Sequence, residues 1–271
     1  SLKKTFNEHL PDVVFHSAAY KHVPLMEVNA EQAILNNIGG TKNIIDLCDE
    51  FNVDQCIVIS TDKAVEPSNS MGSTKRLCEL LTLNKSKTSS TKYCCVRFGN
   101  VLGSYGSVIP LFKEQIKAGG PITITDPKMT RYFMTIKEAV SLVFQAASIS
   151  TSGGELFVLD MGSPIKIVQL ATDLIRLSGL TGDEIKIVYT GLRPGEKLSE
   201  KLFYDFEKHT ITSHEKIYCC YPNLSERIDE LIQAILELAV NEDSNELLIE
   251  KLISTVDQLN HSPTLVSGGR Q

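Results

Sequence analysis

The sequence predicts an α/β fold built around a parallel sheet, and three observations lead to this prediction. Short apolar runs rich in valine and isoleucine, at Val13–Ser17 and Cys56–Ser60, are typical of strands buried on both faces. Between them, Glu31–Phe51 carries apolar residues at near-helical spacing, which completes a β-α-β unit with an expected right-handed crossover. A second unit follows, because Met71–Asn84 has the spacing of a helix and Tyr93–Phe98 the composition of a strand.

The chain changes character after Gly119-Gly120, where shorter predicted strands alternate with helices. We interpret this part as a smaller α/β lobe, followed by helices and a Pro/Ser/Gly tail that we expect to be disordered. The predicted division is 1–120 for the partial sheet domain, 121–222 mainly for the smaller lobe, and 223–271 for the C-terminal helices and tail. Predicted strands lie at Ile122–Thr125 and Leu156–Leu159, and predicted helices at Ser1–Leu10, Ile136–Ala147, Ile165–Leu177, Leu224–Val240 and Glu246–Leu259.

Composition excludes several classes of function. The 271 residues are 42% hydrophobic, enough for a sizeable core, and their net charge of −6 argues against a nucleic-acid surface. No apolar stretch approaches the roughly 18 residues of a membrane span, so we expect no membrane segment in this chain. The seven cysteines form no C-x-x-C pair, which favours a reducing, cytoplasmic location and gives no support for a metal site.

The stretch "ISTDKAVEPSNSMGSTKR" at 59–76 holds the most chemistry-bearing residues. Ser60 and Thr61 stand at the carboxyl end of a predicted strand, where ligands bind in open parallel sheets, and Asp62-Lys63 follow directly. We expect Ser70 to cap the next helix, which carries Lys75 one turn after Met71. A hydroxyl, a carboxylate and two ammonium groups in one pocket suit proton transfer. The alternative is a solvated Asp-Lys pair and an exposed helix lysine.

Six blocks in this order resemble one enzyme family. They are "HSAAYKHVPLME", "NNIGGTKN", "STDKAVEP", "VRFGNVLGSYGSVIPLF", "MTRYFMTI" and "LRPGEKLSE", between about Pro11 and Phe203. Together they look like the nucleotide-sugar 4,6-dehydratases of the CapD-like polysaccharide-biosynthesis family, which are extended short-chain dehydrogenase/reductases with a Rossmann-like fold. Met71 stands where most relatives have the tyrosine of Y-x-x-x-K, as in the membrane-anchored long branch of that family.

The resemblance implies an NAD-dependent lyase acting on UDP-N-acetylglucosamine in surface polysaccharide synthesis. Oxidation at carbon 4 acidifies the hydrogen on carbon 5, water leaves across carbons 5 and 6, and hydride returns to carbon 6. By position in the motifs, Asp62 is the acid, Lys63 the base, and Thr61 with Lys75 replaces the tyrosine. The implied cofactor contacts are Ala18, Ala19, Tyr20, Ser60 and Lys75.

The implied substrate contacts lie in several blocks. They are Lys21, His22, Asn100, Ser107, Val108, Arg131, Arg193 and Glu196, and Asn36 is implied as support near the strand ends. The planar fork of arginine suits a diphosphate, so Arg131 and Arg193 have a physical reason for this role. Surface salt bridges are the competing explanation for Arg131, Arg193 and Glu196, and a plain glycine-rich turn is the alternative for residues 99–106.

No glycine-rich dinucleotide fingerprint occurs before His16. We therefore expect a sheet that is incomplete at its N-terminal side, an unpaired edge at the Val13 strand, and poor NAD binding unless a partner segment contributes. Two alternatives to the dehydratase stay open: an epimerase of the same superfamily, and a non-catalytic sugar-nucleotide-binding remnant. Because the superfamily commonly dimerises, we expect a homo-oligomer.

Overall fold

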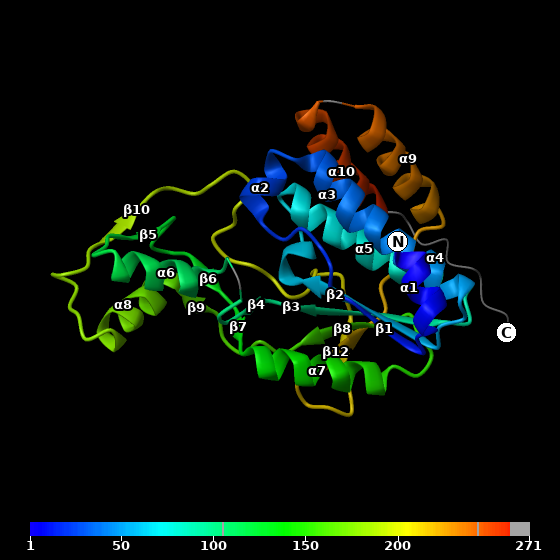
Figure 1. The fold of residues 1–271 in the computed structure, drawn as a ribbon, viewed down its shortest axis with the longest axis horizontal. Coiled ribbons are helices and arrows are strands. Elements are labelled where there is room, and N and C mark those ends of the chain that lie inside the picture. The colour runs from blue at the N-terminus through cyan, green and yellow to red at the C-terminus, as the bar shows by residue number, and fades with distance from the viewer. Residues whose placement is uncertain (105, 243, 261–271) are drawn as a thin grey trace.

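The computed structural model describes residues 1–104, 106–242 and 244–260, and its centre is a six-stranded sheet (Figure 1). The strand order is β1-β2-β3-β8-β12-β11. The first four strands are parallel, whereas β12 runs antiparallel to β8 and β11 antiparallel to β12. The bounds are β1 Val13–His16, β2 Gln55–Thr61, β3 Lys92–Phe98, β8 Leu156–Leu159, β12 Ile217–Cys220 and β11 His209–Ile211. The predicted parallel α/β fold is confirmed.

Helices cover both faces of this sheet (Figure 1). One face packs against α4, α5, α9 and α10, and the opposite face packs against α7. Two short helices, α1 and α2, complete this half of the molecule. The bounds are α1 Leu2–His9, α2 Val23–Glu27, α3 Ala30–Ala33, α4 Gly40–Glu50, α5 Ser70–Lys85, α7 Ile136–Ile149, α9 Ile228–Asn241 and α10 Asn245–Asn260.

The middle of each central strand is apolar because both of its faces are buried. In β2, Cys56 and Val58 enter the core beneath α4 and α5, while Ile57 between them enters the core beneath α7. The same alternation holds in β3, where Cys95 faces the first core and Val96 the second. Successive side chains of a strand point to opposite faces, so a strand between two helical layers has no position for a polar run.

A smaller lobe extends to the left of the sheet in Figure 1. Its core joins helices α6 (Val108–Lys117) and α8 (Ile167–Leu177) to the two-stranded sheet of β5 (Ile122–Ile124) and β10 (Ile187–Tyr189). Short pairs, β4 (Asn100–Val101) with β7 (Phe133–Met134) and β6 (Thr130–Arg131) with β9 (Ile165–Lys166), lie where the chain passes between the lobe and the main sheet. The predicted domain limits at residues 120 and 222 stay predictions.

Strand β1 forms one edge of the main sheet, as the sequence predicts. Among the described residues no other strand pairs with its outer side. Val13 and Phe15 are partly exposed there, and the ring of Phe15 contacts that of Phe144 on α7 with centroids 5.0 Å apart. The contact joins β1 to the helix that covers the opposite face of the sheet from α5.

Three local predictions need comment. The helix predicted at Glu31–Phe51 contains a π-helical turn, η1 (Ile34–Gly39), between α3 and α4, and a π-turn leaves no distinct mark in apolar spacing. The expected cap Ser70 is wrong, because Asn69 caps α5. The tail expected to be disordered falls outside the described residues from 261 onward. No helix within the described part of the chain is both long and apolar enough to span a bilayer.

Candidate active site

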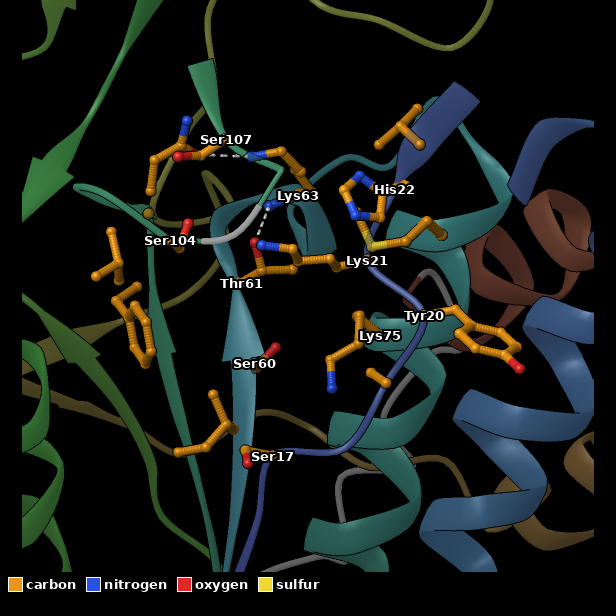
Figure 2. Close-up of a pocket in the computed structure, with 18 of the residues that line it drawn as sticks. Ser17, Tyr20, Lys21, His22, Ser60, Thr61, Lys63, Lys75, Ser104 and Ser107 are labelled. Carbon is orange, nitrogen blue, oxygen red and sulfur yellow. Dashed lines mark hydrogen bonds between the residues drawn. The ribbon is translucent and has the colours of Figure 1, made fainter. Parts of the chain in front are cut away.

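A cavity of about 420 Å³ lies beyond the carboxyl ends of β1, β2 and β3 (Figure 2). This is where open α/β sheets bind ligands, because loops leaving neighbouring parallel strands meet at that edge. Its walls come from the segment after β1, the end of β2, helix α5, and the segment after β3. The lining residues are Ser17, Ala19, Tyr20, Lys21, His22, Val23, Ile59, Ser60, Thr61, Lys63, Met71, Lys75, Phe98, Gly99, Asn100, Val101, Ser104, Gly106 and Ser107.

The connection from β2 to α5 is held in a tight turn. A single 3-10 turn, η2 (Asp62–Ala64), follows β2, and the backbone N–H of Lys63 donates to Thr61 Oγ1 at 3.4 Å. The chain then enters α5 at Asn69, whose Oδ1 accepts from the N–H of Gly72 at 2.7 Å. A Cβ on Gly72 would lie 2.3 Å from the Lys63 carbonyl oxygen. Only glycine therefore lets α5 approach the turn this closely.

Asp62 and Lys63 form the centre of the polar group. Lys63 Nζ donates to Asp62 Oδ1 at 2.9 Å and to Asn100 Oδ1 at 3.1 Å. Thr61 Oγ1 donates to the same Asp62 oxygen at 2.9 Å. Asp62 is 0% exposed and lies behind the cavity wall, and its Oδ2 is buried with no hydrogen-bond partner among the described residues. Lys63, in contrast, reaches the cavity itself.

Lys75 extends from α5 into the cavity, on the side where Ser17 and Ser60 lie (Figure 2). The positive charge of Lys75 repels a proton on His16. His16 is buried at the end of β1 and shares a 3.0 Å hydrogen bond with Thr41 Oγ1. Burial and the repulsion of Lys75 lower the pKa of His16 from 6.5 to about 4. His16 is therefore neutral near pH 7, a buried structural group behind the cavity and not an acid for the reaction.

A buried ionic cluster stabilises the floor beneath Ser60. Ser60 Oγ donates to Glu79 Oε1 at 2.6 Å, and Arg97 binds both carboxylate oxygens of Glu79 at 2.9 and 2.8 Å. Arg76 and Glu207 complete the cluster. Burial would raise the pKa of Glu79, but Arg97, with smaller contributions from Arg76 and Ser60, lowers it to about 2. Glu79 is thus a permanent anion that fixes the strand end.

The structure brings most of the predicted site residues into the cavity. Those lining it are Ala19, Tyr20, Lys21, His22, Ser60, Thr61, Lys63, Lys75, Asn100 and Ser107. Those outside its lining are Ala18, Asp62, Val108, Arg131, Arg193 and Glu196. The Arg131 guanidinium donates to the carbonyl oxygens of Thr130, Lys197 and Leu198 and lies 3.9 Å from Glu196. Arg193 is exposed, and the proposed roles of these residues stay predictions.

The predicted support residue Asn36 is wrong, and its neighbour Asn37 takes that place. Asn36 is exposed and donates to the carbonyl of Gln32 on its own helix. Asn37 is fully buried, accepts from the N–H of Tyr20 at 2.7 Å, and donates to the Tyr20 carbonyl at 3.0 Å. The polar residue that contacts the segment after β1 thus lies one residue later than predicted, within the π-helical turn. Sequence reasoning also missed Glu79 and Arg97, although each is a lone charge in an apolar segment, which is a usable signal.

The fold and this cavity define a Rossmann-fold protein of the extended short-chain dehydrogenase/reductase type. The chain belongs to the family described as "polysaccharide biosynthesis protein", whose sequence profile matches residues 1–222. The predicted family is confirmed. The chain is 51% identical over 94% of its length to the capsular polysaccharide biosynthesis protein CapD of Staphylococcus aureus, of which it spans 42%.

Other relatives differ in the activity that their names state. A Campylobacter jejuni UDP-N-acetylglucosamine 4,6-dehydratase (inverting) is 36% identical over 79% of this chain and 62% of its own length. A Rickettsia akari UDP-glucose 4-epimerase is 41% identical over 70% of this chain and 55% of its own. Identity alone therefore does not separate the two reactions.

Solved structures agree on the fold. Pen from Bacillus thuringiensis superposes with a TM-score of 0.73 at 33% identity, covering 87% of this chain and 78% of its own. The Thermus thermophilus UDP-glucose 4-epimerase in complex with NAD gives a TM-score of 0.67 at 18% identity, over 74% and 72% of the two chains.

Proposed function

We propose that this chain carries the catalytic site of a UDP-N-acetylglucosamine 4,6-dehydratase that serves surface polysaccharide synthesis. The observation that carries the proposal is the contact of Lys63 Nζ and Thr61 Oγ1 with one oxygen of Asp62, at the rim of the cavity. An elimination needs a base and an acid side by side, and this group supplies both. The named activity of the Campylobacter jejuni relative supports the same reaction.

The residues at the inner end of the cavity fit a nicotinamide cofactor. Ser17 and Ala19 leave open space beside Ser60, and the ammonium of Lys75 offers a hydrogen-bond donor for a ribose hydroxyl. When bound, NAD⁺ supplies the acceptor and donor of hydride that a 4,6-dehydration requires. Ser60, fixed by Glu79, and Lys75, on a capped helix, would hold that group in place.

Lys63 is arranged to act as the base at carbon 5. In its neutral form the amine has two N–H bonds, and the structure provides two acceptors for them, Asp62 Oδ1 and Asn100 Oδ1. Its lone pair is then free for a proton from the sugar. Oxidation at carbon 4 acidifies the hydrogen on carbon 5, and Lys63 takes that proton and later returns it to carbon 5.

Thr61 and Asp62 form a path for the second proton. As the hydroxyl on carbon 4 is oxidised, Thr61 Oγ1 accepts its proton and passes its own to Asp62 Oδ1 across the existing 2.9 Å hydrogen bond. Asp62, now a carboxylic acid, is the acid of the elimination: it returns its proton to Thr61 Oγ1, which passes its own to the hydroxyl on carbon 6, and this leaves as water. The positive charge of Lys75 would favour the alkoxide at carbon 4. No proton is gained or lost over the cycle.

The outer end of the cavity suits the diphosphate of a sugar nucleotide. Ser107 immediately precedes α6, and its Oγ is buried with no hydrogen-bond partner among the described residues. Backbone N–H groups at the start of a helix attract anions, and a free hydroxyl adds a donor. Lys21 and His22 face the same space and would add positive charge or donors. Arg131 and Arg193 are proposed to assist from the smaller lobe.

The experiment is mass spectrometry of UDP-N-acetylglucosamine after incubation with the protein and NAD⁺. A product lighter by one water supports the dehydratase. A product of unchanged mass that chromatography resolves as the galacto isomer would instead establish the epimerase, which the Rickettsia akari relative favours. Unchanged sugar nucleotide that still binds would mean that this chain by itself is an incomplete catalytic half or a binding module.

Two substitutions assign the roles. Asp62→Asn and Lys63→Ala should each lower the dehydration rate at least ~100-fold, as loss of a general acid or base does. Lys186→Ala is the matched control, because Lys186 is an exposed lysine paired with Asp183 outside the cavity. Full activity in the Asp62 or Lys63 variant would contradict the proposed chemistry.

A further inference from the structure

Glu200 is a buried carboxylate beside the proposed base Lys63, and it has no role in the chemistry described above. Its Oε1 lies 3.8 Å from Lys63 Nζ, and its Oε2 lies 3.7 Å from Lys197 Nζ. The side chain is only 4% exposed, and Oε2 has no hydrogen-bond partner among the described residues. A buried charge without hydrogen bonds is costly, so its retention calls for a function or a strong counterion.

The segment that carries Glu200 contacts the residues just after Asp62–Ala64 through two lysines, one before Glu200 in sequence and one after it. Lys197 Nζ donates to the Val65 carbonyl oxygen at 2.8 Å, just after η2. Lys201 Nζ forms a 2.8 Å ion pair with Glu66. Val65 and Glu66 directly follow Asp62–Ala64, so these two contacts hold the segment of Glu200 next to Lys63. Its distance from the amine is therefore set by the fold.

Charged groups from three segments of the chain act on Glu200. Burial raises the pKa of Glu200 and the negative charge of Asp62 adds to this, while Lys63, Arg131 and Lys197 oppose it. Burial likewise lowers the pKa of Lys197, although Glu200 opposes this shift. Arg131 and Lys197 balance a carboxylate here, and Lys63 adds a third positive charge when it is protonated.

We propose that Glu200 is a positioning residue that stabilises the ammonium form of Lys63 during proton abstraction from carbon 5, an inference that rests on the proposed dehydratase function. In its neutral form the Lys63 amine donates its two N–H bonds to Asp62 and Asn100. Once it has taken the proton it has a third N–H bond, and Glu200 Oε1 is the nearby acceptor for it. The carboxylate is thus aimed at charge that develops in the reaction.

Steady-state kinetics with Glu200→Gln, Glu200→Asp and the exposed control Asp205→Asn test the proposal. Glu200→Gln should lower kcat roughly 10- to 100-fold with KM within about twofold, since Glu200 does not touch the substrate. Glu200→Asp keeps the charge and should recover part of the loss, and Asp205→Asn should equal the wild type. Circular dichroism identifies variants that fail to fold, and Glu200→Asp then decides.

The pH profile gives a readout that a purely structural role would not move. Because the pKa of Glu200 is raised, wild-type activity should fall as the pH drops through that raised value and neutralises the carboxylate. This step, which adds to the fall in rate caused by protonation of Lys63 itself, should be absent from the profile of Glu200→Gln. An unchanged step in the glutamine variant would overturn the proposal.

A second measurement does not depend on turnover. Acetic anhydride labels only neutral amines, so peptide mass spectrometry can follow acetylation of Lys63, with exposed Lys128 as internal reference. Removing the carboxylate should speed labelling of Lys63 about 3- to 10-fold in Glu200→Gln, because a nearby anion favours the charged amine. Equal labelling overturns the inference whether or not the protein dehydrates the sugar. Altered labelling without dehydration would establish the interaction of Glu200 with the Lys63 ammonium but would give the proposed function no support.

Discussion

Arg97 and Glu207 form a bidentate ion pair in the interior of the protein, with Nη1 donating to Oε2 at 2.7 Å and Nη2 donating to Oε1 at 3.0 Å. Arg97 lies at the end of β3 beside the cavity, and Glu207 lies in the connection that leads to β11. The same guanidinium binds Glu79, which holds Ser60. A chain segment remote in sequence therefore supports the strand end where the proposed chemistry occurs.

Breaking this pair should destabilise the protein strongly. Glu207→Ala leaves the buried charges of Arg97 and Arg76 with one carboxylate between them, and we expect a loss of about 3–5 kcal/mol in the free energy of unfolding. Urea denaturation measures the change. Glu230→Ala is the control, because its ion pair with Arg227 is solvent-exposed and its removal should not change stability measurably. Similar midpoints for both variants would contradict the proposed importance of the cluster.

His16 should make stability depend on pH in mildly acidic solution. Its pKa is about 4 in the folded chain and 6.5 ordinarily, so between these values the unfolded chain binds a proton that the folded chain does not. The stabilising contribution is therefore complete above pH 6.5 and lost as the pH falls toward 4. Thermal melting at several pH values should show this slope, and His16→Gln should flatten it. A variant with the wild-type slope would assign the effect to another group.

The N-cap of α5 links helix stability to the site. Asn69→Ala removes the acceptor for Gly72 and the 2.9 Å contact of its amide with the Gly195 carbonyl, and should cost about 1 kcal/mol. Thr135→Ala removes the corresponding cap of α7 at Glu138, away from the cavity. The two variants should lose similar stability in chemical denaturation. Only Asn69→Ala should also lower turnover, because α5 carries Lys75.

Gly103 and Gly106, at the outer end of the cavity, share a backbone conformation. Alanine variants of the two therefore separate the effect of backbone strain from that of steric crowding. Gly103 and Gly106 have φ values of 74° and 69°, so alanine is strained at both. A Cβ at Gly106 would lie 2.7 Å from His22 Cε1, whereas a Cβ at Gly103 would have no neighbouring heavy atom within 4 Å. Calorimetric titration with UDP should show binding weakened about tenfold more by Gly106→Ala than by Gly103→Ala. Equal effects would place the diphosphate elsewhere.

The parallel sheet and the central site residues could be predicted from sequence because their signals are local. Buried strands such as Cys56–Ser60 are continuous apolar runs, and Thr61, Asp62 and Lys63 follow one of them directly. The same reasoning could not place Glu200, because its approach to Lys63 is a tertiary contact, supported by Lys197 and Lys201. It also misplaced the cap of α5, because Asn69 and Ser70 are equally good capping residues and only geometry selects between them.

In the π-helical turn at Ile34–Gly39, the stability of the helix and the geometry of the site favour different lengths of chain. Removing a single residue from it would restore regular α-helical hydrogen bonds, which should make the isolated helix more stable. The same deletion would rotate the preceding part of the helix by about 100° relative to α4. Asn37 and the backbone of Tyr20 would then lose their paired hydrogen bonds, and the wall of the cavity would lose its attachment. Selection for thermal stability alone would thus be expected to favour a shorter helix at the expense of the site.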